Sequence, residues 1–141
     1  MGTRICFSAS ALGPETAAQA IGEALAAARD FASSIGLDER AAARLAIVIE
    51  EIVSNALRHG MNGGTIACTL TLEETSEGVA IGFDDTGLPF DPTAVGAFTG
   101  PDRRTGGGVG LELVRAWTTR LGYARADGHN RLSLILPIDR A

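Results

Sequence analysis

The sequence predicts an α+β fold, a two-layer sandwich in which a mostly antiparallel mixed sheet carries about three helices on one face. Helical and β-like segments cluster along the 141 residues in the order strand, helix, helix, strand, strand, loop, helix, strand, strand. A dinucleotide-binding fold would need a regular alternation of strands and helices, which the chain lacks. The clustering therefore favours the sandwich and disfavours the dinucleotide fold.

The bulk composition is that of one globular domain spanning residues 1–141. Hydrophobic residues make up 45% of the chain, which suffices for one sizeable core and argues against disorder. The formal net charge of -5 gives no electrostatic basis for direct nucleic-acid binding. A basic partner surface would be the better electrostatic complement.

The expected location of the protein is the cytoplasm. The amino-terminal region has no long apolar segment, so neither a signal peptide nor a membrane anchor is expected. The two cysteines, Cys6 and Cys68, lie in β-like apolar runs without a metal-ligand spacing. We expect both to be buried thiols in a reducing compartment.

The first part of the chain predicts one strand and two long helices. Arg4–Ser8 form a short β-like run. Apolar residues then recur at helical spacing from Pro14 to about Ile35, with the proline in the first turn and a glycine just past the end. A second helix follows, with Asp38 as its N-cap, and runs to about His59.

The second part of the chain predicts two hairpins separated by a long loop and a third helix. The expected elements are strands 65–72 and 79–84, helix 109–120, and strands 123–126 and 132–138, the last two joined over the turn Asp127-Gly128-His129-Asn130. Residues 86–108 show no sustained period. A loop of that length inside a compact domain is usually functional or mobile.

The second helix places a carboxylate and a carboxamide at the edge of its apolar face. Glu51 and Asn55 are four residues apart and therefore point to the same side, just beyond the border of the apolar arc. A carboxylate near apolar walls can have a raised pKa and act as a general base, and a carboxamide oxygen suits Mg²⁺. An ordinary helix with solvated polar residues at its edge has the same pattern, so both interpretations stay open here.

The apolar arc of this helix is expected to face the core. It comprises Leu45, Val48, Ile49, Ile52, Val53, Ala56 and Leu57. His59 falls in the same arc at the end of the helix, where we expect a packed or C-terminal capping histidine and no catalytic role.

An acidic turn follows the second predicted strand at Asp84-Asp85-Thr86-Gly87. An aspartate at such a strand end can accept a hydrogen bond from an exocyclic amine, which favours adenine over guanine. Gly87 would let the backbone pass close to a flat ring. A surface Asp-Gly turn without any ligand is the alternative interpretation.

A glycine-rich segment, residues 106–111, leads into the third predicted helix. The amide groups and the positive dipole end at a helix start attract anions, and glycines let a phosphate approach the backbone. The segment lacks the Lys-Ser/Thr ending of a Walker loop and does not follow a strand, which excludes both that motif and the dinucleotide fingerprint. A flexible hinge is the alternative. Arg104, and less so Arg103, could reach a terminal phosphate, although exposed loop arginines are usually only solvated.

In this order, the three segments resemble the N, G1 and G2 boxes of the GHKL ATP-binding fold, which gyrases, histidine kinases and mismatch-repair ATPases share. More narrowly, nearly the whole chain is similar to the stand-alone anti-sigma factor serine/threonine kinases of bacteria. The Pro-Phe-Asp-Pro run at 89–92 discriminates best between this subfamily and the others. The other matching residues are Glu51, Asn55, Ala56, His59, Asp85, Gly87, Gly107, Gly108, Gly110, Leu111, Leu113 and Val114.

The resemblance implies roles for the matching residues. Glu51 would be the general base that activates the hydroxyl of a protein substrate. Asn55 would bind ATP through the Mg²⁺ that bridges its phosphates. Asp85 would recognise the adenine amino group, with Gly87 beside the ring. The rest of the expected ATP-binding set is Arg104, Gly107, Gly108, Val109, Gly110 and Leu111. Residues from about 93 to 105 would form a short lid.

The resemblance also implies an ATP-dependent protein serine/threonine kinase that is an anti-sigma factor. Such a protein binds a sigma factor and phosphorylates a STAS-type anti-anti-sigma antagonist, with ATP and Mg²⁺ as cofactors. Homodimers are common in the family, and neither a membrane nor a nucleic acid is an expected partner. The chain departs from the family in the segment after the N box, residues 60–64, which is unusually glycine-rich and short. The second residue of the first helix region and the lid arginines match no pattern that would assign a sigma-binding surface.

Other functions stay open at the level of sequence. One is a non-catalytic, ATP-gated binding module in which the nucleotide only orders the lid. Another is a detached histidine-kinase catalytic domain, which the absence of a phospho-accepting helix pair disfavours. A third is an α+β domain that binds no nucleotide.

Overall fold

The structure is a computed structural model that describes residues 2–60, 64–93 and 109–139. Its elements follow one another in the predicted order. They are β1 (Arg4–Ala11), α1 (Pro14–Ser34), α2 (Glu39–Gly60), β2 (Ile66–Thr75), β3 (Gly78–Asp85), α3 (Val109–Trp117), β4 (Thr119–Ala126) and β5 (His129–Pro137).

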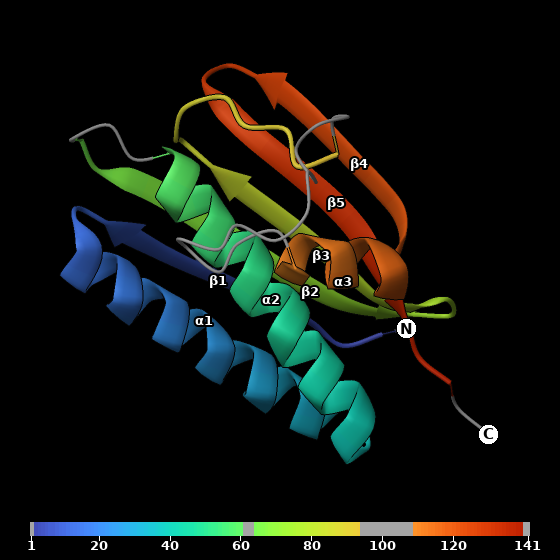
Figure 1. Cartoon of the computed structure of the whole chain (residues 1–141). Helices are drawn as coiled ribbons and strands as arrows, with labels where there is room; N and C mark the ends of the chain where they lie inside the picture. Colours follow the sequence, from blue (N-terminus) through green and yellow to red (C-terminus); the bar gives the residue numbers. More distant parts are fainter. Residues whose placement is uncertain (1, 61–63, 94–108, 140–141) are drawn as a thin grey trace.

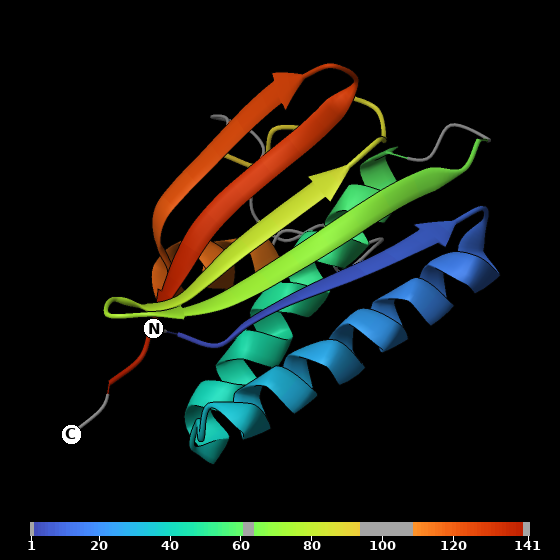
Figure 2. The same cartoon turned by 180° about the vertical axis from the view of Figure 1, so that it is seen from behind.

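The strands form one five-stranded sheet in the order β1-β2-β3-β5-β4. Within the described ranges every strand pairing is antiparallel, whereas the sequence prediction allowed for a mixed sheet. The three helices lie together on one side of the sheet, and the view from behind shows its other face uncovered (Figures 1 and 2). The predicted two-layer α+β architecture is confirmed.

Local chemistry fixes the starts of the two long helices. Pro14 occupies the first turn of α1, where its missing N–H leaves no hydrogen bond unmade. The Asp38 carboxylate accepts a hydrogen bond from the backbone N–H of Ala41 at 2.8 Å, which is the predicted N-cap of α2. Asp38 and Pro14 therefore mark helix starts that the sequence alone located.

The core lies between the sheet and the apolar face of α2. The predicted arc is buried at Leu45, Val48, Ile49, Ile52, Val53 and Leu57, with Ala56 half-buried. Alternate residues of β2 complete the contact by pointing to the same side of the sheet. This alternation also separates the two thiols, because Cys68 is buried on the helix side whereas Cys6 is exposed. The expectation that both cysteines are buried was wrong for Cys6.

The third helix is shorter than predicted. It ends at Trp117, and residues 119–120, expected to be helical, already belong to β4. Arg120 has a positive φ of 55°, and the register of β4 against β5 shifts between Thr119 and Gly122. In a short apolar run, the residue pattern alone does not distinguish the end of a helix from the start of a bulged strand, which explains the error.

Both hairpins are tighter than predicted. The first pairs Thr75 with Gly78 across a two-residue turn, so its strands extend beyond the expected ranges 65–72 and 79–84. The second turns at Asp127 and Gly128, whose φ angles of 53° and 77° fit a two-residue turn of type I′. Of the predicted turn at residues 127–130, only the first two residues form the turn, and β4 and β5 begin at residues 119 and 129, earlier than expected.

Candidate functional site

An open cavity with about 520 Å³ of empty space lies between the helices and the sheet. Its walls are mostly apolar, and three buried polar side chains, Asn55, Asp85 and Asn130, also line it. The other lining residues are Ile52, Ala56, Phe83, Phe90, Pro92, Leu111, Val114, Leu121, Tyr123 and Leu132. An apolar cavity with a few convergent polar groups is the usual form of a small-molecule site. The structure therefore brings together Asn55, Asp85 and Leu111 from the three separate sequence segments.

Glu51 lies beside the cavity, against the first turn of α3. A Cβ atom built on Gly110 would stand only 1.9 Å from the Glu51 Cδ and Oε2 atoms, so only glycine allows this close approach. Partial burial is the main reason that the pKa of Glu51 is raised, and the neighbouring Glu50 raises it further while Arg58 opposes both. The structure thus places a carboxylate of raised proton affinity at the amino end of a helix.

Asn55 is buried one helical turn after Glu51, with 4% of its surface exposed. Its Nδ2 donates to the Glu51 carbonyl oxygen at 2.8 Å, and its Oδ1 accepts from Arg58 Nη2 at 3.2 Å. An amide oxygen has two lone pairs, so one acceptor position on Oδ1 is left for a cation. In the described part of the chain no three His, Cys, Asp or Glu residues cluster as metal ligands. A single amide oxygen such as Asn55 Oδ1 fits a metal that takes few protein ligands and several phosphate oxygens, as Mg²⁺ does.

Asp85 is held at the end of β3 with 4% of its surface exposed. Its Oδ1 accepts hydrogen bonds from the Gly87 backbone N–H at 2.9 Å and from Asn130 Nδ2 at 3.0 Å. Among the described residues no group donates to its second oxygen, Oδ2. The carboxylate lining the cavity therefore has an oxygen that can accept a hydrogen bond from a ligand.

Gly87 has a structural reason to be glycine. A Cβ atom at this position would meet the Cα of Gly60 at 2.8 Å and Asp85 Oδ1 at 3.0 Å. The two glycines let the end of α2 touch the acidic turn, where the Leu88 N–H also donates to the Gly60 carbonyl oxygen at 3.1 Å. The contact joins the end of α2 directly to the turn that follows Asp85.

His59 is exposed and stacks on Phe90, with ring centroids 4.1 Å apart and planes 11° from parallel. Partial burial and the nearby Arg58 lower its pKa, which favours the neutral ring. Phe90 lines the cavity. His59 therefore packs, as expected, but it does so from the surface and against the turn after β3.

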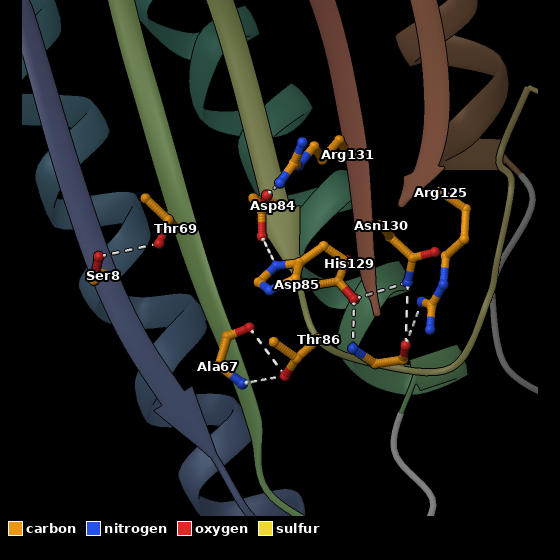
Figure 3. A network of polar contacts seen from close by, with 11 residues as sticks. Ser8, Ala67, Thr69, Asp84, Asp85, Thr86, Arg125, His129, Asn130 and Arg131 are labelled. Carbon is orange, nitrogen blue, oxygen red and sulfur yellow. Dashed lines mark hydrogen bonds and ion pairs between the residues drawn. The ribbon is translucent and has the colours of Figure 1, made fainter. Parts of the chain in front are cut away.

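Asn130 is the buried polar residue that the sequence interpretation missed. It lies directly opposite Asp85 in the pairing of β3 with β5, and its side chain bonds to Asp85 (Figure 3). The sequence does carry one signal, because Asn130 has the same parity as the buried residues Leu132, Leu134 and Leu136. A polar residue on the core face of a strand needs partners, but the identity of those partners depends on a register that the sequence does not show.

Several predicted site residues fall outside the described residues. These are Arg104, Gly107 and Gly108, together with most of the expected lid at 93–105. Val109 begins α3, and Leu111, two residues later, is buried in the cavity wall. Gly110 is the glycine of this segment whose surroundings the structure gives.

Taken together, the sheet covered by helices on one face and the apolar cavity with three buried polar side chains beside α2 and α3 define an ATPase domain of the histidine kinase type. The family model described as "Histidine kinase-like ATPase domain" matches residues 14–136, and the chain belongs to this family. The chain is also similar to the serine/threonine-protein kinase BtrW of Bordetella bronchiseptica. The two are 34% identical over 110 residues, which cover 71% of this chain and 76% of the relative.

The family assignment confirms the predicted GHKL-type fold and implies ATP binding. No helix in the three described ranges combines the length and the apolar content that a bilayer crossing requires.

Proposed function

We propose that this chain is an ATP-dependent protein serine/threonine kinase that also serves as an anti-sigma factor. Its phosphate acceptor would be a STAS-type anti-anti-sigma protein. The observation that carries the kinase proposal is the contact between Glu51 and Gly110, because it sets a carboxylate of raised pKa at the helix start where phosphates would bind. The similarity to a protein named as a serine/threonine kinase supports the same reaction.

At one end of the cavity, Asp85 would select adenine. Its free Oδ2 would accept a hydrogen bond from the exocyclic amine at C6, while Phe83, Tyr123 and Leu132 supply apolar walls for the ring. Guanine carries an oxygen at C6, which would face the carboxylate without a proton between them. ATP is therefore the proposed nucleotide.

At the other end, the amino terminus of α3 would hold the phosphates. The backbone N–H groups of the first helical turn and the positive dipole end favour negative charge there. Asn55 Oδ1 would ligate Mg²⁺, which neutralises charge on the phosphates. Most of the rate acceleration in phosphoryl transfer comes from such positioning and electrostatic stabilisation.

Glu51 would take the proton from the acceptor hydroxyl. The bond from the serine or threonine oxygen to the γ-phosphorus forms as the bond to the ADP oxygen breaks, and the hydroxyl proton passes to the Glu51 carboxylate. The raised pKa of Glu51 makes it a stronger base than an ordinary glutamate once it is ionised.

The partners and the setting are proposed from the family resemblance alone. They are a sigma factor, the STAS-type acceptor and a second copy of the chain in a homodimer, all in the cytoplasm. The net charge of -5 is compatible with a basic partner surface.

The test is a transfer assay with purified STAS-domain proteins from the same organism and Mg-ATP. We expect acid-stable phosphate on the acceptor with the wild type, and none above background with Glu51→Ala, although that variant still binds ATP. Glu50→Ala is the matched control, because Glu50 is exposed one residue earlier on α2. Its removal lowers the pKa of Glu51 but leaves the base in place, so transfer should persist.

Two outcomes would replace the proposal by one of its alternatives. Nucleotide binding without phosphate on any acceptor would favour an ATP-gated binding module. Acid-labile phosphate on the acceptor would indicate a histidine-kinase type of transfer.

A further inference from the structure

Asn130 lies at the centre of a hydrogen-bond network that joins three parts of the cavity wall. Its Nδ2 donates to Asp85 Oδ1 at 3.0 Å and to the Leu88 carbonyl oxygen at 2.9 Å, with the Gly87 carbonyl oxygen farther away at 3.4 Å. Its Oδ1 accepts from the Tyr123 hydroxyl and from the Phe90 backbone N–H. One side chain on β5 thus connects the end of β3, the turn after it and strand β4.

These partners determine which way the amide of Asn130 faces. A carboxamide offers two N–H donors and one acceptor oxygen, and here the two donors meet two oxygens while the oxygen meets two donors. Turning the amide over would set its NH₂ group against the Phe90 N–H and its oxygen against the Asp85 carboxylate. With 5% of its surface exposed, Asn130 has little access to water that could compensate for such mismatches.

The orientation of Asn130 in turn sets the orientation of Asp85. The Gly87 N–H and the Asn130 amide both donate to Oδ1, so this oxygen is engaged. The oxygen left for a ligand in the described structure is Oδ2. Because the site is buried, misplacing this acceptor would cost most of the discrimination between an amine and a carbonyl on the ligand.

We propose that Asn130 is a positioning residue that sets purine selectivity by presenting one oxygen of Asp85 to the cavity. The proposal rests on the proposed function, in which Asp85 reads the C6 amine of ATP. Asn130 acts through Asp85 and through the backbone of residues 87–90.

The opposite face of the same strands offers a matched control. His129 Nδ1 lies 2.5 Å from Asp84 Oδ1, and Arg131 Nε donates to Asp84 Oδ2 at 3.0 Å (Figure 3). This cluster ties the end of β3 to β5 at the level of Asn130, but it is partly exposed and contributes no residue to the cavity wall. Removing His129 therefore loosens the strand ends without altering the polar groups in the cavity.

The experiment compares the affinities of the intact chain for ATP and for inosine triphosphate by titration calorimetry with Mg²⁺. The two nucleotides differ at C6, where inosine has a carbonyl in place of the amine, and at the adjacent N1, which carries a proton in inosine and none in adenosine. Removing a hydrogen bond to a charged group typically costs about 1.4 kcal/mol or more, which is about tenfold in affinity. We therefore expect Asn130→Ala to weaken ATP binding about tenfold and to change inosine triphosphate binding little, so that the preference collapses.

Two further variants make the result decisive. Tyr123→Phe removes one donor to Asn130 Oδ1 and leaves Asn130 in place, and it should reduce the ATP preference about threefold to fivefold. His129→Ala should keep the wild-type preference. Circular dichroism and thermal unfolding establish that each variant is folded, and if Asn130→Ala is not, Tyr123→Phe decides.

The outcomes separate this proposal from the proposed function. A folded Asn130→Ala variant with the wild-type preference overturns the positioning role, as does an equal loss in His129→Ala. If Asp85→Asn abolishes the preference but Asn130→Ala and Tyr123→Phe do not, only the inference about Asn130 fails. If the wild type prefers neither nucleotide, the adenine site itself is wrong and both proposals fall.

Discussion

Gly110 is the residue whose substitution most directly tests the geometry of the proposed catalytic centre. Alanine suits a helix better than glycine, but its Cβ would stand 1.9 Å from the Glu51 carboxylate. The carboxylate is the end of a flexible side chain, so we expect the protein to fold and Glu51 to move aside. Displacing a catalytic group by about 1 Å can lower a rate about a hundredfold. In a single-turnover assay, Gly110→Ala should therefore transfer phosphate about a hundredfold more slowly than the wild type.

Gly22 provides the control for that substitution. It also lies in a helix, α1, but nothing stands within 4 Å of an added Cβ. Gly22→Ala should keep full transfer and raise the free energy of unfolding by about 0.5–1 kcal/mol. Equal activity of the two variants would show that the contact between Gly110 and Glu51 has no part in transfer.

The pH dependence of transfer tests the role of Glu51 as a base. The ionised form accepts the proton, so the rate should fall as the pH drops through the pKa of Glu51, which is raised above 4.5. Glu50 raises that pKa by repulsion. Glu50→Gln should therefore lower the pKa of Glu51 and shift the acid limb of the rate profile to lower pH. Arg58 lowers the same pKa, so Arg58→Gln should shift the limb to higher pH, and shifts in the same direction for both would contradict this assignment.

At the scale of the elements, the cap of α2 contributes stability at a distance from the site. The Asp38 carboxylate accepts the Ala41 N–H at 2.8 Å, and losing an N-cap typically costs about 1 kcal/mol. Asp38→Ala should lower the melting temperature by roughly 3 °C for a chain of this size. Asp38→Asn, which keeps an acceptor, should melt close to the wild type. Because Glu51 lies more than three helical turns away, we expect both variants to retain transfer once folded.

Helix starts were predictable because their signals are local. Pro14 and the Asp38 cap act within a few residues of themselves, and the apolar arc of α2 follows from its period alone. The end of α3 was not predictable in the same way, because the bulge near Arg120 arises from the pairing of β4 with β5. Local patterns located elements, whereas pairings between distant strands decided where some of them stop.

The same distinction separates the predicted from the missed parts of the candidate site. Glu51 and Asn55 share a helix, so their proximity follows from a spacing of four residues. Asp85 and Asn130 are 45 residues apart and meet only because β3 and β5 pair in one register. The parity of Asn130 with the buried leucines of β5 could have marked it as a buried polar residue, but not as a partner of Asp85.

For the molecule as a whole, the cavity depends on the assembly of five elements. Residues of α2, β3, α3, β4 and β5 line it, so a nucleotide bound there would contact both layers of the sandwich at once. Such a ligand binds only the folded chain and should stabilise it as a unit. At a free concentration about 100 times the dissociation constant, the expected gain is about 2.7 kcal/mol, or roughly 8 °C in melting temperature.

Mg-ATP should therefore raise the melting temperature of the wild type in one cooperative transition, as followed by calorimetry. Asp85→Asn should lose most of this shift, because the acceptor for the adenine amine is weakened. Asp84→Asn is the matched control, because the Asp84 carboxylate binds His129 and Arg131 on the other face of the sheet. This variant should keep the shift even if its melting temperature without nucleotide is lower. Chelating Mg²⁺ should reduce the shift because the phosphates then meet α3 without a neutralising cation. An equal shift in Asp85→Asn and Asp84→Asn would place the bound nucleotide away from the cavity.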